Sequence, residues 1–252
     1  DEIVRLGATR CLVVGGPAVV DSTVLAALDS ITGMATPVRI GGADRYETSA
    51  LVADAILTKD GWADWPMIAA MARGDVFADA LALAPIAWAA KMPILLTATD
   101  YLPAPIDDRL ADGPRKLPLY LIAFAGGPSA ISDEVFEYVR DGLSIPADRL
   151  PGSTRYETAA VIAAWSAGSP WLSYDLVGIA TGEDFPDALG GGAAIGKAGG
   201  VLLLTQQGTL TSFTDDALAD VVDETSEVQV MGGVNAISEV VFNAIAEHYA
   251  TD

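Results

Sequence analysis

The chain contains a long internal repeat, which limits the available folds more than any other feature. Arg-Tyr-Glu-Thr begins at Arg45 and again 110 positions later at Arg155. "GDVFADAL" and "GEDFPDAL" follow in the same order 108 positions apart, and so do "PILLT" and "VLLLT". Each series ends in a Gly-Gly turn, at "AGGPSAIS" and "MGGVNAIS". A period of about 110 residues is the size of a small domain and is too long for a solenoid.

The repeat divides the chain into three parts. Residues 1–34, which include a third Gly-Gly turn in "VVGGPAVV", carry the last part of a first unit. Residues 37–142 and 147–252 form two complete units. The first unit therefore looks cut at its front, and we expect the natural chain to begin earlier. No signal peptide is visible in "DEIVRLGATR", so a secreted form would be a mature or trimmed segment.

Each complete unit alternates helices with short strands that are apolar on both faces. In 37–142 the runs "MIAAMA", "PILLT" and "LYLIAFA" predict strands, and "LVGIAT", "VLLLT" and "VQVMG" repeat them. Helices are expected after Asp44 and Ser132, which serve as caps, and around Pro85, where a bend is expected. Such strands pair in parallel with helices on both sides. The prediction is an α/β fold of small three-layer αβα units, of the Rossmann or flavodoxin-like type.

Charge and composition exclude several functions. With 34 acidic and 14 basic residues, the formal charge of −20 repels nucleic acid and anionic membranes, although acidity also serves solubility alone. No uninterrupted apolar span has the length of about 20 residues that a bilayer requires, so we expect no membrane insertion. The chain has one cysteine and one histidine. These counts exclude an intrachain disulfide and argue against a Cys/His metal cluster or a Ser-His-Asp triad in each repeat.

The motifs "RIGGADRYETS", "GDVFADAL", "PILLT" and "GGPSAIS" together resemble the cell-wall-binding repeat type 2 of Gram-positive surface proteins, over essentially the whole chain. The resemblance implies three units packed with pseudo-threefold symmetry, secretion to the cell surface, and noncovalent anchoring on an anionic wall polymer. It implies no cofactor, and an effector domain is often fused to such repeats. Two departures stand out: Ala78 follows Phe77 where the family has proline, and Thr154 replaces the aspartate seen at Asp44.

The resemblance also associates the Ile-Leu-Leu segment with polymer binding. It corresponds here to Ile94, Leu95 and Leu96, and in the next unit to Leu202, Leu203 and Leu204. The pattern itself predicts only central strands. Thr97 and Thr205 end these strands at the carboxyl edge of a parallel sheet, where ligands are usually presented.

Further binding candidates recur at equivalent positions, and each has two interpretations. An arginine at a helix start suits bidentate anion contact, but it also suits a salt bridge that pins one unit to the next. An aromatic ring stacks on a sugar or fills an interface. An aspartate near a helix start ligates a bridging metal or complements the helix dipole. The residues concerned are Arg45, Tyr46, Asp79, Arg155, Tyr156 and Asp187.

Three functions are compatible with the sequence, to different degrees. Wall anchoring suits weak contacts repeated along a polymer. It requires basic residues to gather locally, and Arg39, Arg45, Arg73, Arg149 and Arg155 lie near the repeated motifs, with divalent cations as a further aid. A surface-layer or adhesin component would use the repeats as structural units. An α/β enzyme or nucleotide-binding protein is disfavoured, because no lysine, cysteine or histidine recurs at an equivalent motif position. We therefore predict no catalytic residues and no resident metal.

Overall fold

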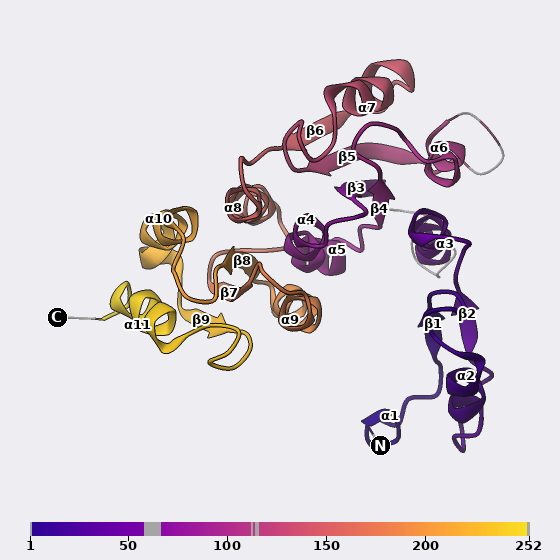
Figure 1. The fold of residues 1–252 in the computed structure, drawn as a ribbon, viewed down its shortest axis with the longest axis horizontal. Helices are drawn as coiled ribbons and strands as arrows, with labels where there is room; N and C mark the ends of the chain where they lie inside the picture. Colours follow the sequence, from indigo (N-terminus) through magenta and orange to yellow (C-terminus); the bar gives the residue numbers. More distant parts are fainter. Residues whose placement is uncertain (1, 58–66, 112, 114–115, 251–252) are drawn as a thin grey trace.

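The computed structural model describes residues 2–57, 67–111, 113 and 116–250. It contains three parallel sheets that follow one another along the chain, as the ribbon in Figure 1 shows. The predicted α/β class with parallel sheets and helices on their faces is confirmed. Among the described residues, no helix has both the length and the apolarity needed to cross a bilayer.

The partial first unit is a two-stranded sheet with two helices. Helix α1 (Glu2–Arg5) precedes strand β1 (Leu12–Val14), and helix α2 (Ser22–Asp29) leads to strand β2 (Val38–Ile40). The strands pair in parallel. In Figure 1 this unit extends from α3 at one end of the molecule.

The second unit has a four-stranded sheet of order β4-β3-β5-β6. Its helices cover both faces, and α7 continues into a short π-helical turn, η1. The elements are α3 (Arg45–Leu57), β3 (Met67–Arg73), α4 (Ala78–Ala82), α5 (Ala84–Ala89), β4 (Ile94–Thr97), α6 (Ala104–Leu110), β5 (Leu119–Ala125), α7 (Asp133–Glu137), η1 (Tyr138–Gly142) and β6 (Ala147–Leu150).

The third unit repeats this order with a three-stranded sheet, β8-β7-β9. A 3₁₀ turn, η2, follows its helix α10. The elements are α8 (Arg155–Ala167), β7 (Leu176–Thr181), α9 (Pro186–Ala198), β8 (Val201–Thr205), α10 (Ser212–Val221), η2 (Val222–Glu224), β9 (Glu227–Val230) and α11 (Glu239–Glu247).

The strand that opens each sequence repeat belongs to the sheet of the unit before it. Strand β2, at the start of 37–142, pairs with β1, and strand β6, at the start of 147–252, pairs with β5. The sequence did not predict these two strands, because "VRI" and "ADRL" each contain a charged residue within a very short run. Sheet pairing therefore ties each unit to the next across the boundary of the repeat.

The two faces of the second sheet have different side chains. Met71 and Phe124 point into a core closed by α3, α6 and α7. Ala70, Ala72 and Ala123 alternate with them and face α4, α5 and α8, in a core shared with the third unit. The helix predicted to bend at Pro85 is divided at Leu83 into α4 and α5.

Small residues bring the second and third units into close contact. A β-carbon at Gly192 of α9 would lie 2.8 Å from that of Ala84, and one at Gly196 would collide with the carbonyl oxygen of Pro85. Phe77 and Phe185 meet edge to face, with ring centroids 5.9 Å apart. Phe77 and Phe185 occupy the same repeat position, as do Ala84 and Gly192. Contacts between such pairs indicate that a rotation axis relates the two units.

Replacing Gly196 by alanine should destabilise the protein, because a backbone oxygen occupies the place of the new methyl group. Overpacking of this kind costs about 1–3 kcal/mol. Gly190 in the same helix is exposed and has nothing near its missing β-carbon, so Gly190→Ala should be neutral or stabilise by about 0.5–1 kcal/mol. Urea unfolding followed by circular dichroism measures both variants. Equal stabilities would show that α5 and α9 do not pack as described.

Candidate functional site: the junction between repeats

The recurring Arg-Tyr-Glu-Thr builds a helix start. In the third unit Thr154 accepts from the Glu157 N–H (3.2 Å), while the Glu157 carboxylate accepts from the Ser153 N–H (2.5 Å). In the second unit Asp44 and Glu47 make the same reciprocal bonds. This is a variant of the capping box, in which the glutamate accepts from the residue before the cap. The cap itself satisfies an N–H that the first turn leaves free. Thr154 therefore caps its helix in the same way as Asp44, the aspartate at the equivalent position of the second unit.

The two arginines of the motif bond backbone carbonyls of their own units. Arg45 Nη1 donates to the Gly74 carbonyl at 2.6 Å, and Arg155 Nη1 donates to that of Gly182. Among the described residues neither arginine makes an ion pair with Asp79 or Asp187. Arg155 nevertheless spans two units, because its guanidinium lies 5.7 Å from the ring centroid of Phe77 in the second unit.

The tyrosines pack over the same glycines. A β-carbon at Gly74 would lie 2.7 Å from a ring carbon of Tyr46, and one at Gly182 would lie 2.7 Å from Tyr156. Both rings are half-buried. In this position they hold the loops that follow β3 and β7 against the starts of α3 and α8.

Two of the predicted basic residues also have structural partners. Arg39 in β2 donates to the carbonyls of Gly15 (2.6 Å) and Val20 (2.7 Å). Arg149 in β6 donates to the carbonyl of Ile131 (2.8 Å). Each arginine fixes the Gly-Gly loop of the unit before its own.

The leucine-rich strands lie mostly in the interior. Leu95, Leu202, Leu203 and Leu204 are buried, so a dissolved polymer cannot reach them in this structure. Ile94 and Leu96 are half-buried and line an open apolar pocket of about 910 Å³ between the first and second units, to which Leu189 of the third unit also contributes. Strand β8 of the third unit, which carries the corresponding leucines, contacts α4 and α5 instead.

The threonines that end these strands are buried and hold the loops that follow. The Thr97 hydroxyl donates to the Tyr101 carbonyl at 3.2 Å, and the Thr205 hydroxyl donates to the Thr209 carbonyl at 3.1 Å. Burial of both side chains is complete. They shape the carboxyl edge of the sheet without facing solvent.

A cleft of about 170 Å³ lies where the second and third units meet, and we call it the junction cleft. A β-carbon at Gly127 would lie 3.3 Å from the carbonyl oxygen of Gly152, so the two loops that form the cleft almost touch. Its walls come from the ends of β3 and β5 and from the start of α8. The lining residues are Arg73, Val76, Asp79, Gly126, Gly127, Ser129, Ala130, Gly152, Ser153, Thr154, Arg155 and Thr158.

Arg73 supplies the second cation of the junction cleft. Its Nε lies 2.6 Å from Asp75 Oδ1, and its Nη1 makes a long bond of 3.4 Å to the Ser129 carbonyl. The Asp75 contact lacks hydrogen-bond geometry, so the buried Nε has no hydrogen-bond partner among the described residues. Arg73 thus lines the same cleft as Arg155, and Asp75 is the counter-ion of its guanidinium group. Its counterpart in the third unit is Thr181.

Asp79 lies beneath the two arginines. Its side chain is 8% exposed and contacts the Gly126 turn, where a β-carbon would lie 3.0 Å from Oδ2. Gly126 has a φ of +97°, which favours glycine. Burial raises the pKa of Asp79, while the positive charges of Arg73 and Arg155 oppose that shift. Asp187 lies against Gly232 in the same way but is less buried.

Asp79 should make the protein less stable as the pH rises. Its pKa is higher in the folded chain than in the unfolded one, so the folded state holds the proton more tightly. The stabilisation is complete below the unfolded pKa of about 3.9 and is lost as the pH rises through the folded pKa. Relative to the wild type, Asp79→Asn should gain stability across this range. Urea unfolding at several pH values tests this, and a constant difference between the two proteins would contradict it.

The structure brings together only some of the predicted site residues. Arg155 and Asp79, which come from different repeats, share the junction cleft, whereas the leucines lie apart from it. Arg73 was noted in the sequence only as a nearby basic residue. Its place at the end of β3 was a usable signal, since the carboxyl ends of parallel strands present ligand-binding groups.

Comparison with known families finds a match to the model described as cell wall binding domain 2, over residues 39–136 and 149–242. Two curated relatives come from Bacillus subtilis (strain 168). The amidase enhancer is 29% identical over 248 residues, which are 98% of this chain and 31% of that protein. N-acetylmuramoyl-L-alanine amidase LytC is 28% identical over 208 residues, which are 82% of this chain and 38% of that protein. The chain thus spans about a third of each relative.

Two solved structures share the fold. Cwp6 from Clostridium difficile superposes with a TM-score of 0.79 at 23% identity, covering 99% of this chain and 37% of that one. Cwp8 from the same organism gives a TM-score of 0.77 at 21% identity, covering 97% of this chain and 38% of that one. The similarity supports the fold of the repeated units.

Proposed function

Because the chain belongs to the family of cell wall binding domain 2, we propose that it anchors a surface protein to the wall by holding an anionic polymer at the junction between repeats. The ligand class is a teichoic-acid-like polymer or an acidic polysaccharide. Secretion to the cell surface and the attachment of an effector domain belong to the same proposal.

The junction cleft is the observation that carries this proposal. It places Arg73 of one repeat and Arg155 of the next on a single small cavity. A phosphate or carboxylate group accepts bidentate hydrogen bonds from the planar guanidinium group, so two such groups favour an oxyanion. Asp79 adds a carboxylate to the same cleft, and burial favours its neutral form. Protonation of Asp79 would strengthen binding of an anion.

Local charge explains how an acidic protein holds an acidic polymer. The formal charge of −20 is spread over the whole chain, whereas screening limits charge interactions to about 8 Å at physiological ionic strength. Arg73 and Arg155 are therefore the positive charges that line the cleft around a bound oxyanion, and they act against the nearby carboxylates Asp75 and Asp79. Repetition of weak contacts along one polymer then raises the overall affinity through effective concentration.

Within this proposal the chain binds the wall and does not carry out catalysis itself. The family model describes a binding domain, and the match covers both complete repeats. LytC is an amidase by name, but the chain spans only 38% of it. Enzymatic activity is therefore assigned to parts of such proteins outside the region matched here.

Replacing Arg73 by glutamine should weaken retention on purified Gram-positive walls. The variant loses one cation from the cleft, and a contribution of about 1 kcal/mol corresponds to a loss of about fivefold in affinity. Its binding should also depend less on salt, because one charge contact fewer is screened. Sedimentation of the chain with walls across a salt series measures both effects, before and after acid extraction of the anionic polymers.

Arg140→Gln is the matched control. It removes the same charge from an exposed residue that pairs with Asp141 and lies 5.2 Å from the centroid of the Phe136 ring. Arg140 does not line the junction cleft, so retention should match that of the wild type. Equal losses in both variants would mean that the junction cleft is not the binding site. Retention that survives acid extraction would refute the anionic polymer as ligand, and ordered assembly without wall binding would favour a surface-layer role.

A further inference from the structure

Strand β9 of the third unit has an open edge. In the first two units the strand before the Gly-Gly turn has an added neighbour, since β1 pairs with β2 and β5 pairs with β6. Both added strands run parallel to the strand they join, and each opens the next sequence repeat. Among the described residues β9 pairs with β7 alone. One edge of β9 therefore presents backbone N–H and carbonyl groups that no strand pairs.

The Gly-Gly turn after β9 shows the same difference in its first glycine. The Gly15 N–H donates to the Ile40 carbonyl at 2.7 Å. The Gly126 N–H donates to the Leu150 carbonyl at 2.9 Å, so both turns are held by the added strand. The N–H of Gly232, at the equivalent position, has no acceptor among the described residues. The open edge thus continues from β9 into its turn.

The second glycine of the turn is uncovered as well. A β-carbon at Gly16 would lie 3.5 Å from the carbonyl oxygen of Gly42, and one at Gly127 would lie 3.3 Å from that of Gly152. Both carbonyls belong to the segment that follows the added strand. A β-carbon at Gly233 would meet no atom within 4 Å. The turn therefore has room for the same segment.

An arginine of the added strand is bound beside this turn in the second unit. Arg149 Nη1 donates to the Ile131 carbonyl at 2.8 Å, and its Nη2 lies 3.1 Å from Asp133 Oδ1. Its guanidinium lies 4.4 Å from the centroid of the Phe136 ring. We call this carbonyl, carboxylate and ring the arginine socket. Arg39 likewise bonds two carbonyls of the first unit.

The third unit carries the same three groups. They recur 106 positions later as Ile237, Glu239 and Phe242. Residues 156–252 contain no arginine that could join them. Phe242 is 53% exposed, whereas Phe136, beneath Arg149, is 9% exposed. An exposed aromatic ring beside a carboxylate and a backbone carbonyl suits a guanidinium group.

We propose that the edge of β9 binds the opening strand of a further repeat of this type, parallel to β9 and with its arginine on Phe242. The sequences at the two paired edges, Arg-Ile-Gly-Gly and Arg-Leu-Pro-Gly, define the ligand as an extended segment with arginine, a branched aliphatic residue, any residue and glycine. Main-chain hydrogen bonds would supply affinity, and the arginine would fix register.

The occupant is a strand from outside this chain's own two complete units. A second copy of the chain has its strands β2 and β6 already paired, so it could offer them only by opening its own sheets. The docking is also separate from wall anchoring, because the edge of β9 and the arginine socket share no residue with the junction cleft.

A peptide copy of a known occupant tests the proposal. The blocked peptide Thr-Pro-Val-Arg-Ile-Gly-Gly-Ala reproduces residues 36–43. The ²H,¹⁵N-labelled chain is titrated with it at constant pH, and the amide signals of Gly232 and Gly233 are followed by NMR. We expect a saturable shift. Peptides with glutamine or lysine in place of arginine should bind about tenfold more weakly, because neither places a planar guanidinium on the ring.

The lysine peptide keeps the positive charge and therefore separates recognition from simple attraction to an acidic protein. Equal binding by the arginine and lysine peptides would overturn the proposal in favour of charge alone. A titration without saturation would overturn it too. A shift of the same signals with chain concentration, in the absence of peptide, would assign the edge to contacts between copies.

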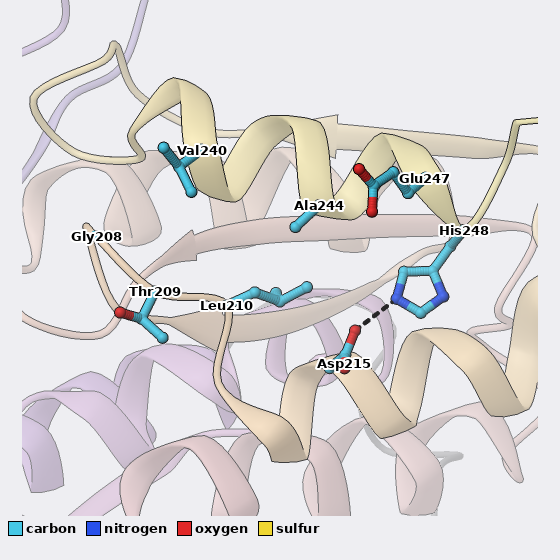
Figure 2. A pocket seen from close by; sticks show the side chains of 8 residues that line it. All are labelled: Gly208, Thr209, Leu210, Asp215, Val240, Ala244, Glu247 and His248. Atoms are coloured by element: carbon cyan, nitrogen blue, oxygen red, sulfur yellow. Dashed lines mark hydrogen bonds and ion pairs between the residues drawn. The ribbon is translucent and has the colours of Figure 1, made fainter.

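Two variants of α11 test the socket itself. Phe242→Ala removes the ring and should weaken binding of the arginine peptide about fivefold. Val240→Ala is the matched control, because it truncates another exposed apolar side chain of the same helix. Val240 lines the groove between α10 and α11 instead (Figure 2), so binding should match that of the wild type. Circular dichroism establishes that both variants are folded, and equal binding by the two would contradict the proposed socket.

Discussion

The pairing of strand β6 with strand β5 is the contact on which the rest of the arrangement depends. These strands belong to different sequence repeats, yet they form one parallel sheet. Since β6 is followed after a few residues by the Arg155 helix, the pairing brings the start of α8 to the Gly126 turn of the preceding unit. The junction cleft exists because of this connection. Strands β1 and β2 are joined in the same way, so the constraint recurs along the chain.

Close packing of small residues also holds the second and third units together. The second sheet turns an alanine-rich face toward the third unit, and α9 presents glycines to α5. Because these side chains are small, the helices and sheets approach one another closely. The close approach brings many atoms into van der Waals contact, and their dispersion attraction holds the units together. For the binding proposed at the junction cleft, close packing matters because a cleft shared by two units keeps its geometry only if the units do not slide.

Repetition also lets one scaffold carry different surfaces. The residues that hold the fold recur, including the capping glutamates, the arginines on the glycine carbonyls and the aspartates beneath the Gly-Gly turns. Other positions vary, as Arg73 against Thr181 and Tyr138 against Ala244 show. Each difference changes the chemistry of a cavity without altering the elements around it. The junction cleft, which Arg73 lines, is one such result.

Much of this organisation was determined by the sequence alone. The repeat, the α/β class, the long strands, the Ser132 cap and the break near Pro85 all follow from local patterns, since capping and periodicity act over a few residues. Strands β2 and β6 escaped prediction because pairing with a distant strand, and not their own composition, makes them strands. The tertiary structure likewise decided that Arg73 joins Arg155, and that Ile94 and Leu96 line a pocket while Leu202 and Leu204 are buried, because proximity between repeats depends on how the units pack.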